Sequence, residues 1–439
     1  MLPQSTLTIV APIKPAEAAM VVLRDVLAAI GRDPVANPLV PFGDLTGLHY
    51  GRFVILDGAV DPGTGRTVAS SLVFNCCVDG PADQFLQALM ARAGSGLWAV
   101  FQHCSGAPAP GEHGELLAWL RRHRIPTQTF YVNTLGRTVF QILKEAQLRE
   151  RIEGFLDRKA GSTTTATSPS TVRKAIQQFV RGTNDLAWAM RPEPPLPWAW
   201  RLRDGLHRIG GLAVGLLVGL LALPFVPLFL VVLRRSEINA PHPRQDPNFR
   251  LSQFNRRQLS QDEDFFIQNQ FSVLGFIKPG LFRYATLRAI LVVADFVVHH
   301  FFREGDLGTV PLLNLHGVDT IHFANWIVVD QGQRVLFLSN YDFNLEDYMN
   351  DFINKVAWGL NLIFGHGVNY PRTDWMVFGG ARDEQVYKAV LRKYQIRTQV
   401  WFCAYPDFSA ITIQKNAQLR AGLFAELDSA AERDWLALL

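Results

Sequence analysis

The chain contains an internal repeat, and this repeat constrains the fold more than any other feature of the sequence. The block TIVAPIKPAEAAMVVLRD near the start is matched by SVLGFIKPGLFRYATLRA in the second half, which aligns Lys14 with Lys278. Further matching blocks follow in the same order over roughly 150 residues, an agreement that is hard to obtain by chance. The sequence therefore predicts a tandem duplication, with copies near residues 6–157 and 271–424.

The repeat aligns polar residues as well as apolar ones. LHYGRFVILD pairs with IHFANWIVVD and aligns His49 with His322, while GLWAVFQHCSG pairs with GLNLIFGHGVN and aligns His103 with His366. We therefore expect these histidines to occupy the same structural position in each copy.

Each copy predicts the same order of elements, β-α-β-β-α-β. A strand leads into a helix that begins after Lys-Pro, because proline suits the first helical turn. A strand hairpin, two helices, a last strand and a closing helix follow. This order is that of a ferredoxin-like unit, whose sheet carries helices on one face and leaves the other to be covered. The predicted fold class is α+β, with the two units packed sheet to sheet.

In this arrangement the chain resembles the dimeric α+β barrel superfamily. Blocks such as TIHFANWIVVD and LFLSNYDFNLEDYMNDFI also look like poorly characterised, peroxidase-related bacterial proteins associated with membranes. The resemblance implies an internal α+β barrel and, through the dye-decolourising peroxidases and chlorite dismutase, haem as a cofactor. The GxxDG motif of those peroxidases has no match, since GARDE at residues 380–384 lacks the final glycine. No catalytic residue is carried over from that family.

An insert at residues 158–270 separates the two repeats, 1–157 and 271–439. GSTTTATSPST predicts a flexible linker. The next stretch, TVRKAIQQFVRG, predicts an amphipathic helix with Ile176 and Val180 on one face, a pattern typical of a helix at a membrane interface. Residues 209–233, IGGLAVGLLVGLLALPFVPLFLVVL, then run for 25 residues without a charge.

This uncharged segment predicts attachment to a membrane, since about 20 apolar residues span a bilayer core. A single crossing would separate the two copies, Pro224 and Pro227 interrupt the helix, and arginines flank both ends. We therefore expect the segment to enter one leaflet and leave by the same, cytoplasmic face, with membrane lipid as a partner. A buried core helix is the alternative.

Charge and cysteine content narrow the class of protein further. The net charge of +4 is dispersed over 43 basic and 39 acidic residues, so the sequence predicts no nucleic-acid partner. The four cysteines lack metal-ligand spacing, and we expect them to be reduced thiols in the core.

His322 is the first candidate ligand for haem iron or another metal, because it shares a strand face with the small Ala324. His366 is the second candidate. The alternative for each is a structural role. His322 would donate a hydrogen bond to a backbone carbonyl, and His366 would stabilise a helix C-terminus. His299 and His300 end another apolar helix, where the same structural explanation applies.

The loops of the second copy are richer in polar residues than those of the first. Asp342, Arg372 and Asp374 are the candidate catalytic residues, since an arginine and carboxylates beside an oxidant can move protons and polarise a peroxide. Residues of these types also form turns and helix caps, which is the alternative.

The resemblance, together with the uncharged segment, thus implies a membrane-attached, haem-dependent, peroxidase-like oxidoreductase that acts on a small lipophilic substrate. The competing prediction is a non-catalytic membrane-associated protein that holds an apolar ligand or a partner in the barrel. GxSxG, HExxH and Walker motifs do not occur, so hydrolase, zinc-protease and NTPase functions have no support.

Overall fold

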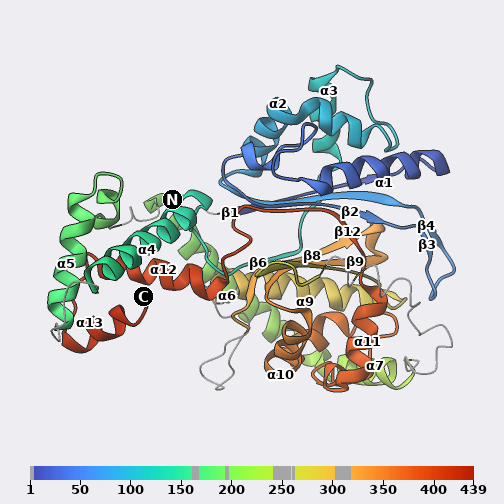
Figure 1. Ribbon diagram of the computed structural model, residues 1–439. Helices are drawn as coiled ribbons and strands as arrows, with labels where there is room; N and C mark the ends of the chain where they lie inside the picture. Colours follow the sequence, from blue (N-terminus) through green and yellow to red (C-terminus); the bar gives the residue numbers. More distant parts are fainter. Residues whose placement is uncertain (1–3, 161–167, 193–196, 241–258, 260–262, 302–317) are drawn as a thin grey trace.

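A computed structural model describes residues 4–160, 168–192, 197–240, 259, 263–301 and 318–439. The fold is mixed α/β, with two four-stranded antiparallel sheets stacked between two layers of helices (Figure 1). The predicted linker spans residues 161–171, of which 161–167 lie outside the described residues; from Pro169 onward it is helix instead, because Ser168 caps the helix Pro169–Gly182.

The first sheet has the strand order β1-β5-β2-β12. Its strands are β1 (Gln4–Pro12), β5 (Ser71–Asp79), β2 (Leu48–Leu56) and β12 (Thr398–Cys403). Alternate residues of β5 point to opposite faces, so that Leu72 and Phe74 pack under the helices while Val73 faces the other sheet. The face that carries Leu72 and Phe74 is covered by α1 (Glu17–Arg32), α2 (Ala82–Phe101) and α3 (His113–Arg122).

The second sheet has the order β6-β8-β9-β7. Its strands are β6 (Thr129–Val132), β8 (Ile321–Val329), β9 (Arg334–Asp342) and β7 (Gln268–Phe276). The helices on its outer face are α9 (Leu281–His300), α10 (Leu345–Phe364) and α11 (Glu384–Tyr394). Two small hairpins complete the strands: β3 (Ala59–Val60) with β4 (Thr67–Val68), and β10 (Thr373–Asp374) with β11 (Phe378–Gly379).

The two halves of the chain exchange their last strands, which the sequence did not predict. The segment before β6 first runs beside β1, where Ile9 bridges Arg124, and β6 then pairs with β8 of the second half. The second half does the same, because Val273 bridges Gln395 before β12 pairs with β2. Each half therefore supplies the edge strand of the other half's sheet.

The inner faces of the two sheets share one apolar layer. Buried side chains from both sheets meet in it: Val54, Leu56, Val73, Leu274, Ile327, Val329, Leu336 and Leu338. Beside this layer, Arg52 is fully buried and donates to Asn340 across the gap between the sheets. Burial lowers the pKa of Arg52 to about 10. Side chains of both sheets thus occupy the space between them.

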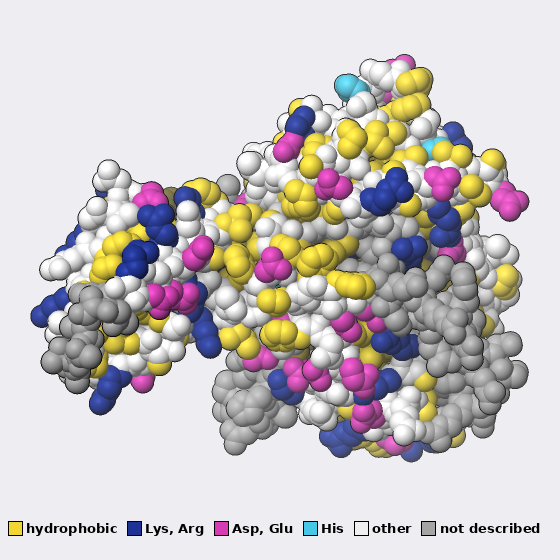
Figure 2. Space-filling view, viewed as in Figure 1, with side chains coloured by type: hydrophobic (Ala, Val, Ile, Leu, Met, Phe, Trp, Pro, Cys, Tyr) yellow, Lys and Arg dark blue, Asp and Glu magenta, His cyan; other side chains and the backbone are white. Residues whose placement is uncertain are grey.

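The closing helices of the two halves form a separate lobe, at the left of Figure 1. It contains α4 (Val139–Ala160), α5 (Pro169–Gly182), α12 (Ala410–Gly422) and α13 (Ser429–Leu436). Ile176 and Val180 of α5 are fully buried in this lobe. The expected interfacial position of this helix is therefore wrong, because its apolar face packs against neighbouring helices. Basic and acidic side chains are interspersed over the face seen in Figure 2.

The apolar part of the insert, residues 198–238, is called the insert from here on. It forms α6 (Trp198–Ala222), a 3-10 turn at Leu223–Phe225 and α7 (Val226–Ile238). Among the described residues, this continuous stretch of 41 residues is the one helix long and apolar enough to cross a membrane. Its most apolar window has a mean hydropathy of 2.8 and is only 6% buried. A buried core helix, the alternative for this segment, does not match that exposure.

Candidate functional site

His322 is held by a carboxylate and an amide. Its Nε2 lies 2.7 Å from Oδ1 of Asp342, and its Nδ1 lies 3.4 Å from Nε2 of Gln268. The other oxygen of Asp342 accepts a hydrogen bond from the backbone N–H of Ala410, at the start of α12. The imidazole thus orients a carboxylate that caps a helix.

His49 makes the equivalent arrangement in the first half. Its Nε2 lies 3.0 Å from Oδ1 of Asp79, whose Oδ2 accepts from the backbone N–H of Val139, at the start of α4. The Tyr405 hydroxyl lies 2.6 Å from Nδ1 of His49. Both histidines therefore connect a sheet to the first turn of a closing helix.

These surroundings do not fit a haem ligated by His322. Both ring nitrogens face polar side chains, and the Tyr405 and Phe323 rings lie 6.4 and 6.5 Å from the imidazole, centroid to centroid. Iron would have to displace Asp342 or Gln268 from a side chain that is 3% exposed. The haem and metal roles of His322 stay predictions, and this geometry favours the structural alternative.

His366 is buried at the C-terminal end of α10, and neither ring nitrogen has a partner within the described part of the chain. Burial, with Arg283 and Lys278 nearby, lowers the pKa of His366 to about 3, so the ring is neutral. The adjoining cavity has a volume of about 50 Å³, which admits a water molecule but no porphyrin.

The three predicted catalytic residues do not converge. Asp342 lies just before the start of α10, whereas Arg372 and Asp374 follow its end. Asn361, in the last turn of α10, donates to the Gly379 carbonyl oxygen and so holds the segment with Arg372 and Asp374 at that end. A helix of 20 residues is about 30 Å long, so Asp342 lies at one end of α10 and Arg372 with Asp374 at the other. Arg372 is exposed and Asp374 is paired with Arg234 of α7.

A large apolar cavity lies outside the sheet, between α9 and α10. Its volume is about 660 Å³, within the range of small-molecule sites. Small residues of the two helices leave the space open, among them Ala285, Ala289 and Gly359, and Phe229 of α7 reaches it from the insert. A Cβ atom added at Gly359 would meet no atom within 4 Å.

Two tryptophans also line this cavity. Trp326 of β8 and Trp358 of α10 have indole N–H groups that are buried and have no partner among the described residues. The Thr129 hydroxyl, also at the wall, donates to the Leu291 carbonyl oxygen. The wall is almost entirely apolar, so a ligand that fits must be mostly apolar.

The insert contacts α9 on either side of this cavity. Phe229 packs on Phe282 with ring centroids 5.4 Å apart, and a Cβ atom on Gly211 would lie 2.2 Å from the Phe296 ring. Phe282 and Phe296 are 14 positions apart, which is about 21 Å along α9. Gly211 and Phe229 are 18 positions apart, which would be about 27 Å along a straight helix. The insert therefore cannot follow α9 in a straight line between the two contacts, and Leu216 and Phe225 in this stretch are exposed.

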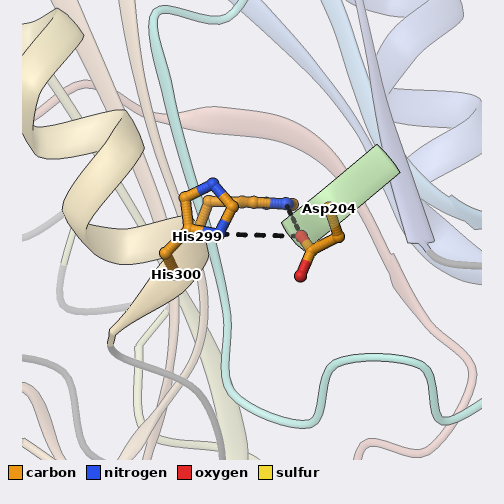
Figure 3. Close-up of side chains that lie close together, drawn as sticks. All are labelled: Asp204, His299 and His300. Atoms are coloured by element: carbon orange, nitrogen blue, oxygen red, sulfur yellow. Dashed lines mark ion pairs between the residues drawn. The ribbon is translucent and has the colours of Figure 1, made fainter. Parts of the chain in front are cut away.

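A second cluster lies where α6 meets the end of α9. His299 Nε2 and His300 Nδ1 lie 3.3 and 3.6 Å from the same carboxylate oxygen of Asp204 (Figure 3). His300 Nε2 lies 2.7 Å from Nδ1 of His207, one turn further along α6. Among the described residues, Asp204, His299 and His300 form a group whose ligand atoms lie close enough together to hold a metal ion.

Comparison of the chain with known protein families, curated proteins and solved structures gave no match. Function must therefore be argued from the residues themselves. Sequence reasoning missed Asp204 and the cavity, although two signals were present. Asp204 and His207 share a helix face at a spacing of three, and small residues recur along the face of α9 that also carries Phe282 and Phe296.

Proposed function

We propose that the protein is a membrane-attached lipid-binding protein that holds an amphipathic lipid in the cavity between α9 and α10. The observation that carries this proposal is the apolar cavity of about 660 Å³, which Phe229 of the exposed apolar helix helps to line. An acyl or isoprenoid chain satisfies the apolar walls.

The insert provides the membrane contact in this proposal. Exposed apolar surface on α6 and α7 is stabilised by about 25 cal/mol per Å² when it enters hydrocarbon. Both ends of the insert pack on α9, which itself covers the second sheet, so a wedge in one leaflet fits these contacts better than a crossing. The flanking arginines, such as Arg208 and Arg235, suit an anionic cytoplasmic surface.

The rest of the chain acts as a rigid support for this site. We infer that its two halves are duplicated ferredoxin-like units that form an internal barrel, as in the dimeric α+β barrel superfamily. The equivalent pairs His49–Asp79 and His322–Asp342 and the reciprocal exchange of strands support this inference. The lipid then lies outside the barrel, because side chains fill the space between the sheets.

The experiment compares lipids that stay bound to the purified full-length chain, identified by mass spectrometry after extraction, in the native protein and in two variants. Gly359→Leu places a side chain in the cavity without a clash and should reduce bound lipid at least tenfold. Gly114→Leu, on α3, is the matched control, because its added Cβ also meets nothing within 4 Å.

Equal lipid content in Gly359→Leu and the control would contradict the proposal. An absorption spectrum of the same preparation tests the haem-dependent alternative, since a Soret band after haem supplementation would favour the peroxidase prediction. His322→Ala should then abolish haem loading while leaving the far-ultraviolet circular dichroism nearly native.

A further inference from the structure

The residues around Asp204 have the composition of a metal site. Two imidazoles and one carboxylate form the protein ligand set of several zinc and non-haem iron sites. The three ligand atoms, from Asp204, His299 and His300, all lie within 4.8 Å of one another. Bonds of about 2.0–2.1 Å in a tetrahedral site place neighbouring ligand atoms about 3.3 Å apart, close to the separations of 3.3 and 3.6 Å found here.

His207 extends the cluster on α6. Nε2 of His300 lies 2.7 Å from Nδ1 of His207, so one proton is shared between the two rings. This contact fixes the orientation of the His300 ring, whose Nδ1 lies 3.6 Å from the Asp204 oxygen.

The cluster also has an open side. A cavity of about 290 Å³ adjoins it, lined by Trp200, Arg203, Asp204, His207 and His299. Three protein ligands with an adjoining space are typical of sites where water or an anionic group completes the coordination. The His300 side chain is fully buried and that of Asp204 is 15% exposed, whereas that of His299 is 43% exposed on the open side.

We propose that Asp204, His299 and His300 bind one divalent transition-metal ion of the zinc type. His207 is a positioning residue that fixes the orientation of the His300 ring. The ion joins α6 to α9 directly before the uncharged segment begins at Ile209, and thereby fixes where the insert leaves the folded domain. This site is independent of the proposed lipid cavity.

The test uses the full-length chain without a polyhistidine tag, in lipid nanodiscs, after treatment with a chelator. Calorimetric titration with Zn²⁺ should give one ion per chain, and Co²⁺ should give visible ligand-field absorption. Asp204→Asn, His300→Ala and His299→Ala should each weaken binding at least 100-fold. His207→Ala should weaken it by about 10- to 100-fold, the usual effect of removing a residue that orients a ligand.

His113→Ala is the matched control, because His113 is an exposed histidine on α3 outside the cluster. His299→Ala keeps the test valid if a more buried variant fails to fold. Absence of stoichiometric Zn²⁺ binding, or equal affinity in His299→Ala and the control, would overturn the metal site. Gly359→Leu should bind Zn²⁺ normally, so failure of the lipid proposal is measured separately.

Discussion

The two halves of the molecule share an order of elements but differ in how the outer face of each sheet is closed. In the first half, the segment between α1 and β2 packs down on the helices, with Val40 and Phe42 fully buried. The Leu39 carbonyl oxygen lies where a Cβ atom of Gly96 would be, so this contact requires glycine in α2. In the second half, where residues 302–317 between α9 and β8 lie outside the described part of the chain, the described residues of α9 and α10 line an open apolar space. The same plan thus supports a packed half and a ligand-sized cavity.

The halves differ equally in their contacts with the insert. Glu237 of α7 is buried in the second half, where it accepts from the Thr373 hydroxyl and from the backbone N–H groups of Trp375 and Met376. Ser236 accepts from Nε of Arg283. The cavity wall formed by α9 and α10, the two α9 histidines of the Asp204 cluster and the residues that contact α6 and α7 all lie in the second half. In the two proposals made above, the first half therefore supports the fold and the second half provides most of each site.

The largest expected effect tests whether the two halves share one compartment. Epitope tags at the two termini, in sealed inverted vesicles treated with protease, should both be digested, because the halves exchange strands and cannot be separated by a bilayer. The result is all or none. Protection of just one tag would show a true crossing and would contradict the strand exchange itself.

The next effect compares the two carboxylates that cap the closing helices. Asp342→Ala should lower the free energy of unfolding by about 3 kcal/mol, because it leaves a buried imidazole and the Ala410 N–H without an acceptor. Asp79→Ala should cost less, about 2 kcal/mol, because His49 keeps its hydrogen bond to Tyr405. Urea unfolding followed by circular dichroism measures both.

Asp342→Asn serves as the conservative control, since its side-chain oxygen still accepts one hydrogen bond and should recover part of the loss. If Asp342→Ala leaves stability unchanged, Asp342 is free for the catalytic role predicted from its sequence context. The structural explanation of the His322–Asp342 pair would then be wrong.

Much of the scaffold could be predicted from the sequence, because repetition is a signal that a single chain contains. The hairpins, the Lys-Pro helix starts and the equivalence of His49 and His322 all follow from aligned blocks. The exchange of β6 and β12 could not be predicted, because an alternating strand has the same pattern in either sheet. Asp204 and His300 are 96 positions apart, and only the packing of α6 on α9 brings them together.

The smallest expected effect compares the two lysines of the repeated Ile-Lys-Pro motif. Lys14 is exposed, whereas Lys278 is half-buried and donates to the Gly365 carbonyl oxygen. Burial and the nearby Arg283 lower the pKa of Lys278 to about 7, with Glu237 opposing the shift.

The pH dependence follows from this difference in packing. Between about pH 7 and 10.5 the unfolded chain binds one more proton at Lys278, so its contribution to the free energy of unfolding rises by at most about 1.4 kcal/mol per pH unit. Lys278→Met should remove this slope and stabilise the protein at pH 6.5 by about 1 kcal/mol, after the lost hydrogen bond is subtracted. Lys14→Met should change stability by less than about 0.5 kcal/mol at any pH. His366 has little influence on these slopes, because its folded-state pKa of about 3 and the ordinary histidine value of about 6.5 place most of its contribution below pH 6.5. Urea unfolding at pH 6.5, 8 and 9.5 measures the slopes, and equal slopes in Lys278→Met and the native chain would show that Lys278 is solvated like its counterpart in the first half.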